Sequence, residues 1–363
     1  MRVLVVNAGS SSLKLSVLEG GQVLAKSDLP ADRDGFDRDE LAAFLNGTEL
    51  DAVGHRVVHG GTEFTEPTVL DDDVLNALRD LTDLAPLHQP KSLAGIDAVA
   101  AVRPGLPTVA CFDTAFHATL SEVAYTYAIP AEWRSQWKVR RFGFHGLSHA
   151  CSSRRAAGII GRPASALRLV VCHLGAGASL CAVAGGRSVD TTMGFTPLEG
   201  LVMATRSGSV DPGLVLWLQE HAGLSAAQVA AALEHESGLL ALGGDDDMRA
   251  LLRRAERGDA GAMLAIDVYV HRLVAGIAAM TAALGGLDVL VFTGGVGENA
   301  SAIRAAAAES LAHLGVNLDN HLNKNASRDA DLSSTDSLVR TVVVAAREDL
   351  EIERGVQSAL LAG

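Results

Sequence analysis

The sequence is poor in cysteine and contains no long uninterrupted apolar run. Its four cysteines, Cys111, Cys151, Cys172 and Cys181, form neither a CxxC pair nor the spacing of a metal site, so we expect reduced core residues. No apolar signal segment precedes the first predicted strand, and charged residues interrupt the most apolar helical stretch, 263–284. We therefore expect a cytoplasmic protein that does not enter the membrane.

Positive charge is also scarce. The 363 residues include 30 Lys and Arg against 43 Asp and Glu, which leaves a formal net charge of −13. Binding to nucleic acid depends on clustered Lys and Arg that release counterions, and this sequence shows no such cluster, so we expect no nucleic-acid partner. An acidic protein that binds an anion must build a local positive site. The informative residues are therefore the arginines that lie among small or apolar neighbours.

The chain twice places a hydrophobic strand before a turn of small residues. The first is RVLVVNAGSSSLK at 2–14, and the second is LVVCHLGAGASL at 169–180. Backbone N–H groups in such a turn can approach an anion, although an ordinary β-hairpin turn explains either loop by itself. Asn7 and His173 occupy corresponding places 166 residues apart, nearly half the chain length. The repeat predicts two duplicated domains that face one another across a nucleotide cleft.

Strand and helix patterns alternate along the rest of the chain, which predicts a mixed α/β fold. In the first half, strands are predicted at 52–59 and 107–112, and helices at 71–84 and 91–102. In the second half, a strand set opens at 168 and the strand in 288–299 enters a glycine turn. The remaining predictions are helices at 212–221, 225–237, 259–284, 300–314 and 350–361 and a strand at 339–345.

The glycine turn at 294–297 could let a nucleotide lie against bare backbone, and the following helix would offer a favourable dipole. The chain has no GxxxxGK[ST] motif, which argues against a P-loop protein. The GAGAS turn at 175–179 lacks the third glycine and the following helix of a dinucleotide-binding motif. The sequence therefore indicates phosphate binding by turns of another kind.

Two arginines and several carboxylates are candidates for chemistry on phosphate. Arg56 and Arg206 lie among glycines and small residues and could clamp an anion, or each could form a surface salt bridge. Asp113 follows one predicted strand, and Glu348 with Asp349 follows another. These carboxylates could hold Mg²⁺, or Asp113 and Asp349 could act as helix N-caps. His145, in a GFHG turn, could donate to a charged transition state or serve the fold alone.

Eight motifs occur in this order along the chain: NAGSSSLK, GHRVVHGG, APLHQP, FDTAFH, RFGFHGLSH, DTTMGFTPLEGLVMATRSGSVDPG, DDMR and FTGGVGEN. Taken together, they resemble the acetate kinase family over nearly the whole chain. The resemblance implies two ribonuclease H-like domains of duplicated topology, the fold that sugar kinases share with actin and heat-shock chaperone ATPases. We place the first domain at 1–150, joined by a C-terminal helix at 350–363, and the second, nucleotide-binding domain at 151–349.

The resemblance also assigns roles to individual positions. Arg56, Asp113, His145 and Arg206 match catalytic residues, and Arg56 also matches a substrate-binding residue. Asn7 and Glu348 match residues that bind Mg²⁺, with Mn²⁺ as the alternative metal. The pocket for the substrate methyl group corresponds to Val58, Leu87, Phe144 and Pro197, and the phosphate loop to Ser10 and Ser12, while His88 matches a further active-site histidine. The positions that match binding of ATP or ADP are Lys14, His173, Gly175, Gly177, Asp247, Met248, Arg249, Gly295, Val296, Gly297 and Asn299.

The implied activity is reversible phosphoryl transfer from ATP to acetate, giving acetyl phosphate, by a homodimer. A short carboxylic acid is ionised near neutral pH, so its oxygen can attack the γ-phosphate without a general base. Kinases for propionate, butyrate or other short acids are alternatives within the same class. Ala176 stands where the family usually has asparagine. That departure leaves open a protein of another class, a switch that binds ATP without transferring phosphate.

Overall fold

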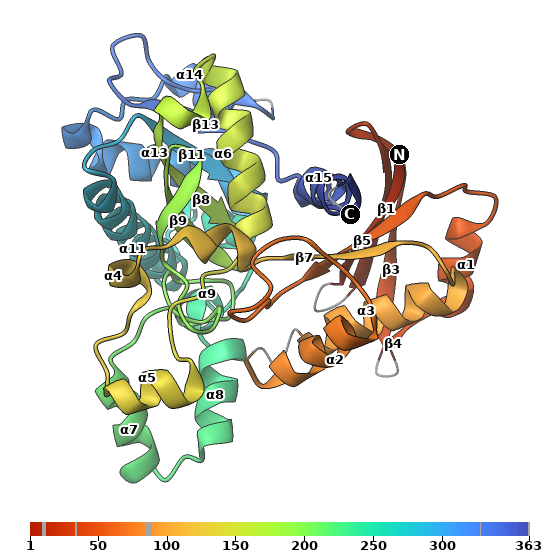
Figure 1. Ribbon diagram of the computed structural model, residues 1–363. Helices are drawn as coiled ribbons and strands as arrows, with labels where there is room; N and C mark the ends of the chain where they lie inside the picture. The colour runs from red at the N-terminus through yellow and green to blue at the C-terminus, as the bar shows by residue number, and fades with distance from the viewer. Residues whose placement is uncertain (9–11, 33–34, 85–88, 327, 362–363) are drawn as a thin grey trace. The chain divides into compact units, whose positions relative to one another are not determined.

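The computed structural model describes residues 1–8, 12–32, 35–84, 89–326 and 328–361 (Figure 1). The chain forms two compact units, and it crosses between them four times. The C-terminal helix belongs to the first unit, whereas the segment Thr119–Gly143, which the sequence-based division assigned to the first domain, belongs to the second. The first unit comprises Met1–Ala118, Phe144–Cys151 and Arg347–Gly363, and the second comprises Thr119–Gly143 and Ser152–Ala346.

The first unit is built on a seven-stranded sheet in the order β4-β3-β2-β1-β5-β7-β6. Strands β1, β2 and β3 pair in antiparallel fashion, whereas β1, β5 and β7 run parallel. The chain reverses between β2 and β3 because Gly20 and Gly21 adopt positive φ. The strands are β1 (Arg2–Ala8), β2 (Ser12–Glu19), β3 (Gln22–Asp32), β4 (Gly35–Phe36), β5 (Ala52–Val57), β6 (Thr68–Val69) and β7 (Thr108–Phe112).

Helices cover both faces of this sheet, which explains why β1 is a continuous hydrophobic run. Leu4 and Val6 pack on the face that α3 covers, and Val3 and Val5 pack on the face of α15. Close approach of α15 requires Gly54 on β5, since a Cβ there would lie 2.5 Å from Ile352. The helices are α1 (Arg38–Leu45), α2 (Asp72–Asp80), η1 (Leu81–Leu84), α3 (Gln89–Val102), η2 (Ala115–Thr119), α6 (Gly146–Ile160) and α15 (Glu348–Leu361), of which η2 and α6 continue into the second unit.

The second unit repeats this arrangement with a six-stranded sheet in the order β10-β9-β8-β11-β13-β12. Strands β8 and β9 are antiparallel, like β1 and β2 in the first unit. Strands β8, β11 and β13 are parallel, like β1, β5 and β7. Strands β1 and β8 are each seven residues long. The predicted duplication and α/β fold class are confirmed. The strands are β8 (Arg168–Leu174), β9 (Ala178–Ala184), β10 (Arg187–Thr191), β11 (Val289–Thr293), β12 (Ala330–Asp331) and β13 (Arg340–Val343).

The helices of the second unit include α11 (Ala260–Leu284), which contacts β8, β9 and β10. By length and composition this helix could cross a membrane, but core helices of globular domains meet the same criterion. The predicted glycine turn is itself a short helix, α12 (Gly294–Asn299). All four cysteines lie in the described part of the chain, where they are buried and form no disulfide, as expected. The other helices are α4 (Glu122–Tyr125), α5 (Ala131–Trp137), η3 (Ala164–Ala166), α7 (Pro212–Glu220), α8 (Ala226–His235), α9 (Gly238–Gly243), α10 (Met248–Ala255), α13 (Ser301–Ser310), η4 (Ala312–Leu314) and α14 (Asn320–Lys324).

Candidate active site

Four residues from distant parts of the sequence form a polar cluster in the first unit. Asn7 lies near the end of β1, Arg56 near the end of β5, and Asp113 directly after β7. Because these three strands are parallel neighbours, their carboxyl ends share one edge of the sheet. Glu348, the first residue of α15, completes the group, which we call the Arg56 cluster.

Hydrogen bonds connect all members of the Arg56 cluster. The Arg56 guanidinium donates to both carboxylate oxygens of Asp113, with Nη2 2.5 Å from Oδ2, and its Nη1 donates to Oδ1 of Asn7 at 3.1 Å. Nδ2 of Asn7 donates to Oε2 of Glu348 at 3.1 Å, and that oxygen lies 3.9 Å from Nε of Arg56. Arg56 thus forms an ion pair with Asp113. This pair is largely buried and is not a surface salt bridge.

Burial and charge act against each other in the Arg56 cluster. Burial by itself lowers the pKa of Arg56, but the negative charges of Asp113 and Glu348 outweigh it and raise the pKa above its ordinary value. Burial raises the pKa of the Asp113 carboxyl, and the Arg56 guanidinium opposes that rise. Removing either partner would leave a buried charge without compensation, which is strongly destabilising. The guanidinium is therefore fixed in place and permanently charged.

The GFHG turn lies next to the Arg56 cluster. The N–H of Gly146 donates to the carbonyl oxygen of Asp113 at 2.8 Å, and a Cβ at Gly146 would lie 2.2 Å from that oxygen. His145, directly before it, has a φ of 57°, a left-handed conformation that is uncommon for a residue with a side chain. Phe144 is buried, and its ring lies 5.5 Å from that of His59. The turn therefore presents its histidine through a tightly constrained backbone.

The other residues predicted for the first unit have simpler surroundings. Val58, just after β5, is buried, as expected for an apolar pocket residue. Ser12 begins β2, and the Lys14 side chain is exposed on that strand, in register with Asn7. Predicted positions Ser10, Leu87 and His88 lie outside the described residues.

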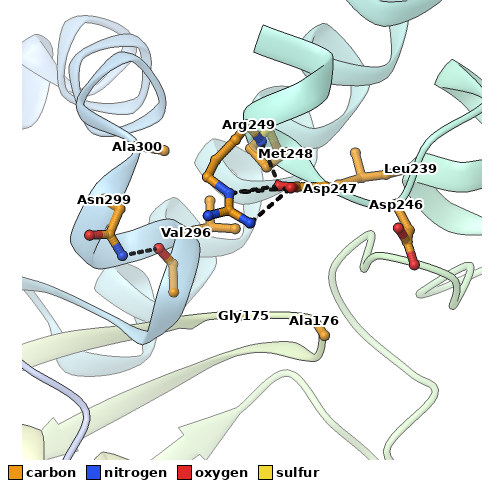
Figure 2. A pocket seen from close by; sticks show the side chains of 11 residues that line it. Gly175, Ala176, Leu239, Asp246, Asp247, Met248, Arg249, Val296, Asn299 and Ala300 are labelled. Carbon is orange, nitrogen blue, oxygen red and sulfur yellow. Dashed lines mark hydrogen bonds and ion pairs between the residues drawn. The ribbon is translucent and has the colours of Figure 1, made fainter. Parts of the chain in front are cut away.

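A cavity of about 540 Å³ in the second unit contains most of the predicted nucleotide-binding residues; we call it the α10–α12 pocket. Its walls come from the β8–β9 turn, α9, the start of α10, and α12 (Figure 2). Seven predicted residues line it: Gly175, Asp247, Met248, Arg249, Gly295, Val296 and Asn299. Ala176, Leu239, Asp246 and Ala300 also line it and were not among the predicted site residues; for Leu239 no sequence signal could have indicated this.

Polar side chains at the α10–α12 pocket are held by their neighbours. In Figure 2 the Arg249 guanidinium faces the Asp247 carboxylate, with Nη2 2.9 Å from Oδ2. Hydrogen bonds from the side chain and backbone of Arg249 lower the pKa of Asp247. Nδ2 of Asn299 donates to the carbonyl oxygen of Gly295 at 2.8 Å. The Arg249 side chain is 77% exposed, so its ion pair is hydrated and the guanidinium is available to a ligand.

Two glycines and one histidine of the second unit that were predicted to bind nucleotide are not among the residues that line the α10–α12 pocket. Gly177 accepts the N–H of Gly175 through its carbonyl oxygen at 2.9 Å and so shapes the β8–β9 turn. A Cβ on Gly297 would lie 3.7 Å from Leu174, so this glycine faces β8. His173 lies at the end of β8, where a Cβ on Gly175 would be 3.6 Å from its Nε2.

Arg206 and Pro197 lie in a long loop of the second unit. Nη1 of Arg206 donates to the carbonyl oxygen of Pro197 at 2.7 Å. The loop is anchored at Glu199, which accepts hydrogen bonds from Arg141 and Tyr127, each at 2.6 Å. No function was predicted from the sequence for Glu199, Arg141 or Tyr127. These contacts give Glu199 of the MGFTPLEGL segment two hydrogen-bond partners within the second unit.

The Arg56 cluster offers oxygen ligands for a metal. The described residues include no group of three or more His, Cys, Asp or Glu that could hold an ion. The cluster instead combines one amide oxygen, from Asn7, with the carboxylates of Asp113 and Glu348. Amide and carboxylate oxygens are the ligands that Mg²⁺ prefers, and it commonly uses only one or two protein carboxylates together with substrate phosphates. The residues present therefore fit Mg²⁺.

Two units of duplicated topology, the second with a pocket against the glycine-rich helix α12, give this chain the fold of acetate and sugar kinases. A family model described as the Acetokinase family matches residues 38–354. The chain belongs to the acetokinase family and is a kinase. Acetate kinase of Deinococcus deserti is 46% identical over 394 aligned residues, which cover 100% of this chain and 98% of that protein.

Solved structures agree with this assignment. The crystal structure of Porphyromonas gingivalis acetate kinase has a TM-score of 0.91 and 35% sequence identity, covering 99% of each chain. A propionate kinase from Francisella tularensis also has a TM-score of 0.91, with 36% identity, covering 98% of this chain and 99% of that one. The resemblance expected from the motifs is confirmed.

Proposed function

We propose that this protein transfers the γ-phosphoryl group of ATP to the carboxylate of acetate, giving acetyl phosphate and ADP, and catalyses the reverse reaction. The observation that carries the proposal is the Arg56 cluster, a buried and permanently charged guanidinium among oxygen ligands at the ends of three parallel strands. The match to acetate kinases over the whole chain supports it.

Phosphoryl transfer to acetate requires electrostatic stabilisation of the reacting anions more than it requires a general base. An oxygen of the acetate carboxylate forms a bond to the γ-phosphorus, the bond from that phosphorus to the bridging oxygen breaks, and ADP leaves with the electron pair. Because both reactants are anions, their repulsion is the main obstacle. In this proposal Arg56 and Arg206 offset that repulsion, and His145 donates a hydrogen bond to the transferring group. Asp113 orients Arg56 through its paired hydrogen bonds.

Binding of the two substrates is assigned to different residues. Val58 and Phe144, with Leu87 and Pro197, form the apolar pocket for the acetate methyl group in this proposal, and the burial of Val58 and Phe144 supports it. ATP or ADP occupies the α10–α12 pocket, whose volume of about 540 Å³ suits a nucleoside. His173, Gly177, Gly297, Ser10, Ser12 and Lys14 are assigned to the phosphates by resemblance alone.

Asn7 and Glu348 would hold Mg²⁺, or Mn²⁺ in its place. The metal would neutralise charge on the nucleotide phosphates during transfer. The hydrogen bond between the Asn7 amide and the Glu348 carboxylate brings these two ligands together before a metal binds.

Formation of acetyl phosphate by the purified protein tests the proposal. Hydroxylamine traps acetyl phosphate as a hydroxamate, and ADP release can be followed in the same reaction. We expect turnover with acetate that depends on ATP and Mg²⁺. The absence of acyl phosphate from acetate, propionate and butyrate would refute the proposed activity.

Two alternatives have a specific motivation. The similarity to a propionate kinase motivates a longer acceptor, and kcat/KM measured for acetate, propionate and butyrate separates the two. Ala176, which lines the α10–α12 pocket, motivates a switch that binds ATP without transfer. Tight ATP binding together with no acyl phosphate would favour the switch, whereas turnover would exclude it.

We also propose a homodimer that uses the second unit. All three tryptophans of the chain, Trp133, Trp137 and Trp217, are about half exposed, and they lie on α5 and α7 (Figure 1). Leu216 beside Trp217 is also exposed. Exposed aromatic side chains of this kind are enriched in protein interfaces. Analytical ultracentrifugation of the wild type and of Trp217→Glu tests this; a monomeric wild type would refute it.

A further inference from the structure

Where the chain leaves the sheet of the second unit, two carboxylates accept hydrogen bonds from its backbone. Val344 donates its N–H to a carbonyl of β11 at 2.9 Å, as a strand residue would. The next two N–H groups donate to side chains instead. Ala345 donates to Oδ1 of Asp329 at 3.1 Å, and Ala346 donates to Oε1 of Glu298 at 2.9 Å. Ala346 is the last residue of the second unit before the chain enters the first.

Glu298 belongs to α12, the helix that forms one wall of the α10–α12 pocket. Val296 and Asn299 of this helix line the pocket (Figure 2), and so does Gly295, whereas Glu298 is not among the lining residues. Its side chain is only 11% exposed and reaches the N–H of Ala346. One short helix thus contacts the site proposed for the nucleotide and also holds the segment by which the chain leaves the unit.

A buried arginine fixes the backbone of α12. Nη1 of Arg304 on α13 donates to the carbonyl oxygens of Gly297 and Glu298, both at 2.8 Å. Nε of the same guanidinium donates to Oδ1 of Asn323 at 2.8 Å. Arg304 is 2% exposed, so water does not compete for these hydrogen bonds. The backbone at the end of α12, including that of Glu298, is therefore held to α13.

Glu348 follows Ala346 by only two positions. With about 3.8 Å between consecutive Cα atoms, at most about 8 Å of chain separates the two residues, and it contains no glycine. The Glu348 carboxylate accepts a hydrogen bond from Asn7 in the Arg56 cluster. A shift of the Ala346 amide would therefore reach Glu348 through a single intervening residue, Arg347.

We propose that Glu298 is a positioning residue, which couples occupancy of the α10–α12 pocket to the placement of Glu348 through the Ala346 N–H. The catalytic role of Glu348 rests on the proposed function. The coupling between the pocket and Glu348 does not depend on that role. Nucleotide bound against α12 would restrict that helix, and the Glu298 hydrogen bond would extend the restriction to residues 345–350. A coupling of this kind requires a continuous physical link between the two places, which these contacts supply.

Hydrogen–deuterium exchange with ADP as the ligand tests the coupling without relying on turnover. In the wild type, ADP should slow exchange at 294–299 and also at 345–350. In Glu298→Ala, the slowing at 294–299 should persist while that at 345–350 falls by about fivefold or more. Glu298→Gln should behave as the wild type, because its carboxamide oxygen can accept the same hydrogen bond. Glu309→Ala, on an exposed position of α13, is the matched control and should also behave as the wild type.

Kinetics give the second readout. Glu298→Ala should lower kcat, and raise the Mg²⁺ concentration for half-maximal activity, on the order of tenfold, as loss of a residue that orients a metal ligand does. Its KM for ATP should change less than about twofold, since the α10–α12 pocket is intact, and Glu298→Gln should recover the wild-type values.

Three results would overturn the proposal. The first is full ADP protection at 345–350 in Glu298→Ala, and the second is loss of protection at both segments, which would mean that Glu298 only stabilises α12. The third is equal impairment in Glu298→Gln and Glu298→Ala. Absence of acyl phosphate formation by the wild type would refute the proposed function instead, and the exchange experiment would still decide the coupling.

Discussion

Acidification should destabilise this protein through His55, a buried histidine in the sheet of the first unit. His55 lies on β5 and is 2% exposed, and its Nε2 has no hydrogen-bond partner among the described residues. Burial lowers its pKa to about 3, whereas an unfolded histidine has a pKa of about 6.5. Between pH 6.5 and pH 3, His55 is therefore protonated in the unfolded chain but neutral in the folded protein. Stability is present above pH 6.5 and is lost as the pH falls toward 3.

The pKa difference sets the size of the effect. From pH 7 to pH 5, His55 should contribute about 2 kcal/mol of lost unfolding free energy, and by pH 4 about 3 kcal/mol. Losses of this size are a large fraction of the 5–15 kcal/mol by which domains are typically stable. His59 adds to the effect, because burial lowers its pKa to about 4.

Urea unfolding of the wild type and of His55→Leu at pH 8, 7, 6 and 5 isolates this residue. The substitution changes packing by an amount that does not depend on pH, so only the variation of the difference with pH is informative. We expect the wild type to lose about 2 kcal/mol more than the variant between pH 7 and pH 5. Between pH 8 and pH 7 the difference should stay constant, since the histidine is neutral in both states. A difference that stays constant down to pH 5 would refute the reasoning.

Three further substitutions test the proposed site. Arg56→Ala and Arg206→Ala should each lower kcat on the order of 10³-fold, as loss of an arginine that stabilises a transferring phosphoryl group does; steady-state kinetics with circular dichroism as the folding control would measure this, and a loss below tenfold would contradict the assigned role. His145→Ala should be milder if it removes only a hydrogen-bond donor, and an effect larger than that of either arginine would contradict this. Gly295→Ala should raise KM for ATP and leave KM for acetate and the melting temperature unchanged, because its Cβ would meet only open space at the α10–α12 pocket. Gly294→Ala is the matched comparison and should lower the melting temperature instead, because it has a φ of 79° and a Cβ there would lie 2.7 Å from the Leu174 carbonyl oxygen; equal melting temperatures for the two variants would contradict this distinction.

Patterns that depend on neighbouring residues were predictable from the sequence. The apolar runs of β1, β8 and β11 have the composition of strands buried on both faces, and the structure places them at the centre of their sheets. The strand-and-turn segments around Asn7 and His173 indicated the duplication, because β1 and β8 occupy corresponding places in the two sheets and each pairs in antiparallel fashion with the next strand. The boundaries were less accurate. The turn at 294–297 is a helix, since glycines that open a helix and glycines that form a loop look alike in sequence.

Contacts between residues far apart in the sequence were decided only by the tertiary structure. The hydrogen bond between Asn7 and Glu348 joins residues 341 positions apart, and no local pattern marks either as the partner of the other. The same is true of Glu298, the last residue of the FTGGVGE sequence. Its side chain accepts a hydrogen bond from Ala346, which lies 48 positions further along the chain. Local sequence determined which segments became strands and helices, because backbone periodicity acts over a few residues. Sheet order and helix packing determined which side chains meet, because these depend on the folding of the whole chain.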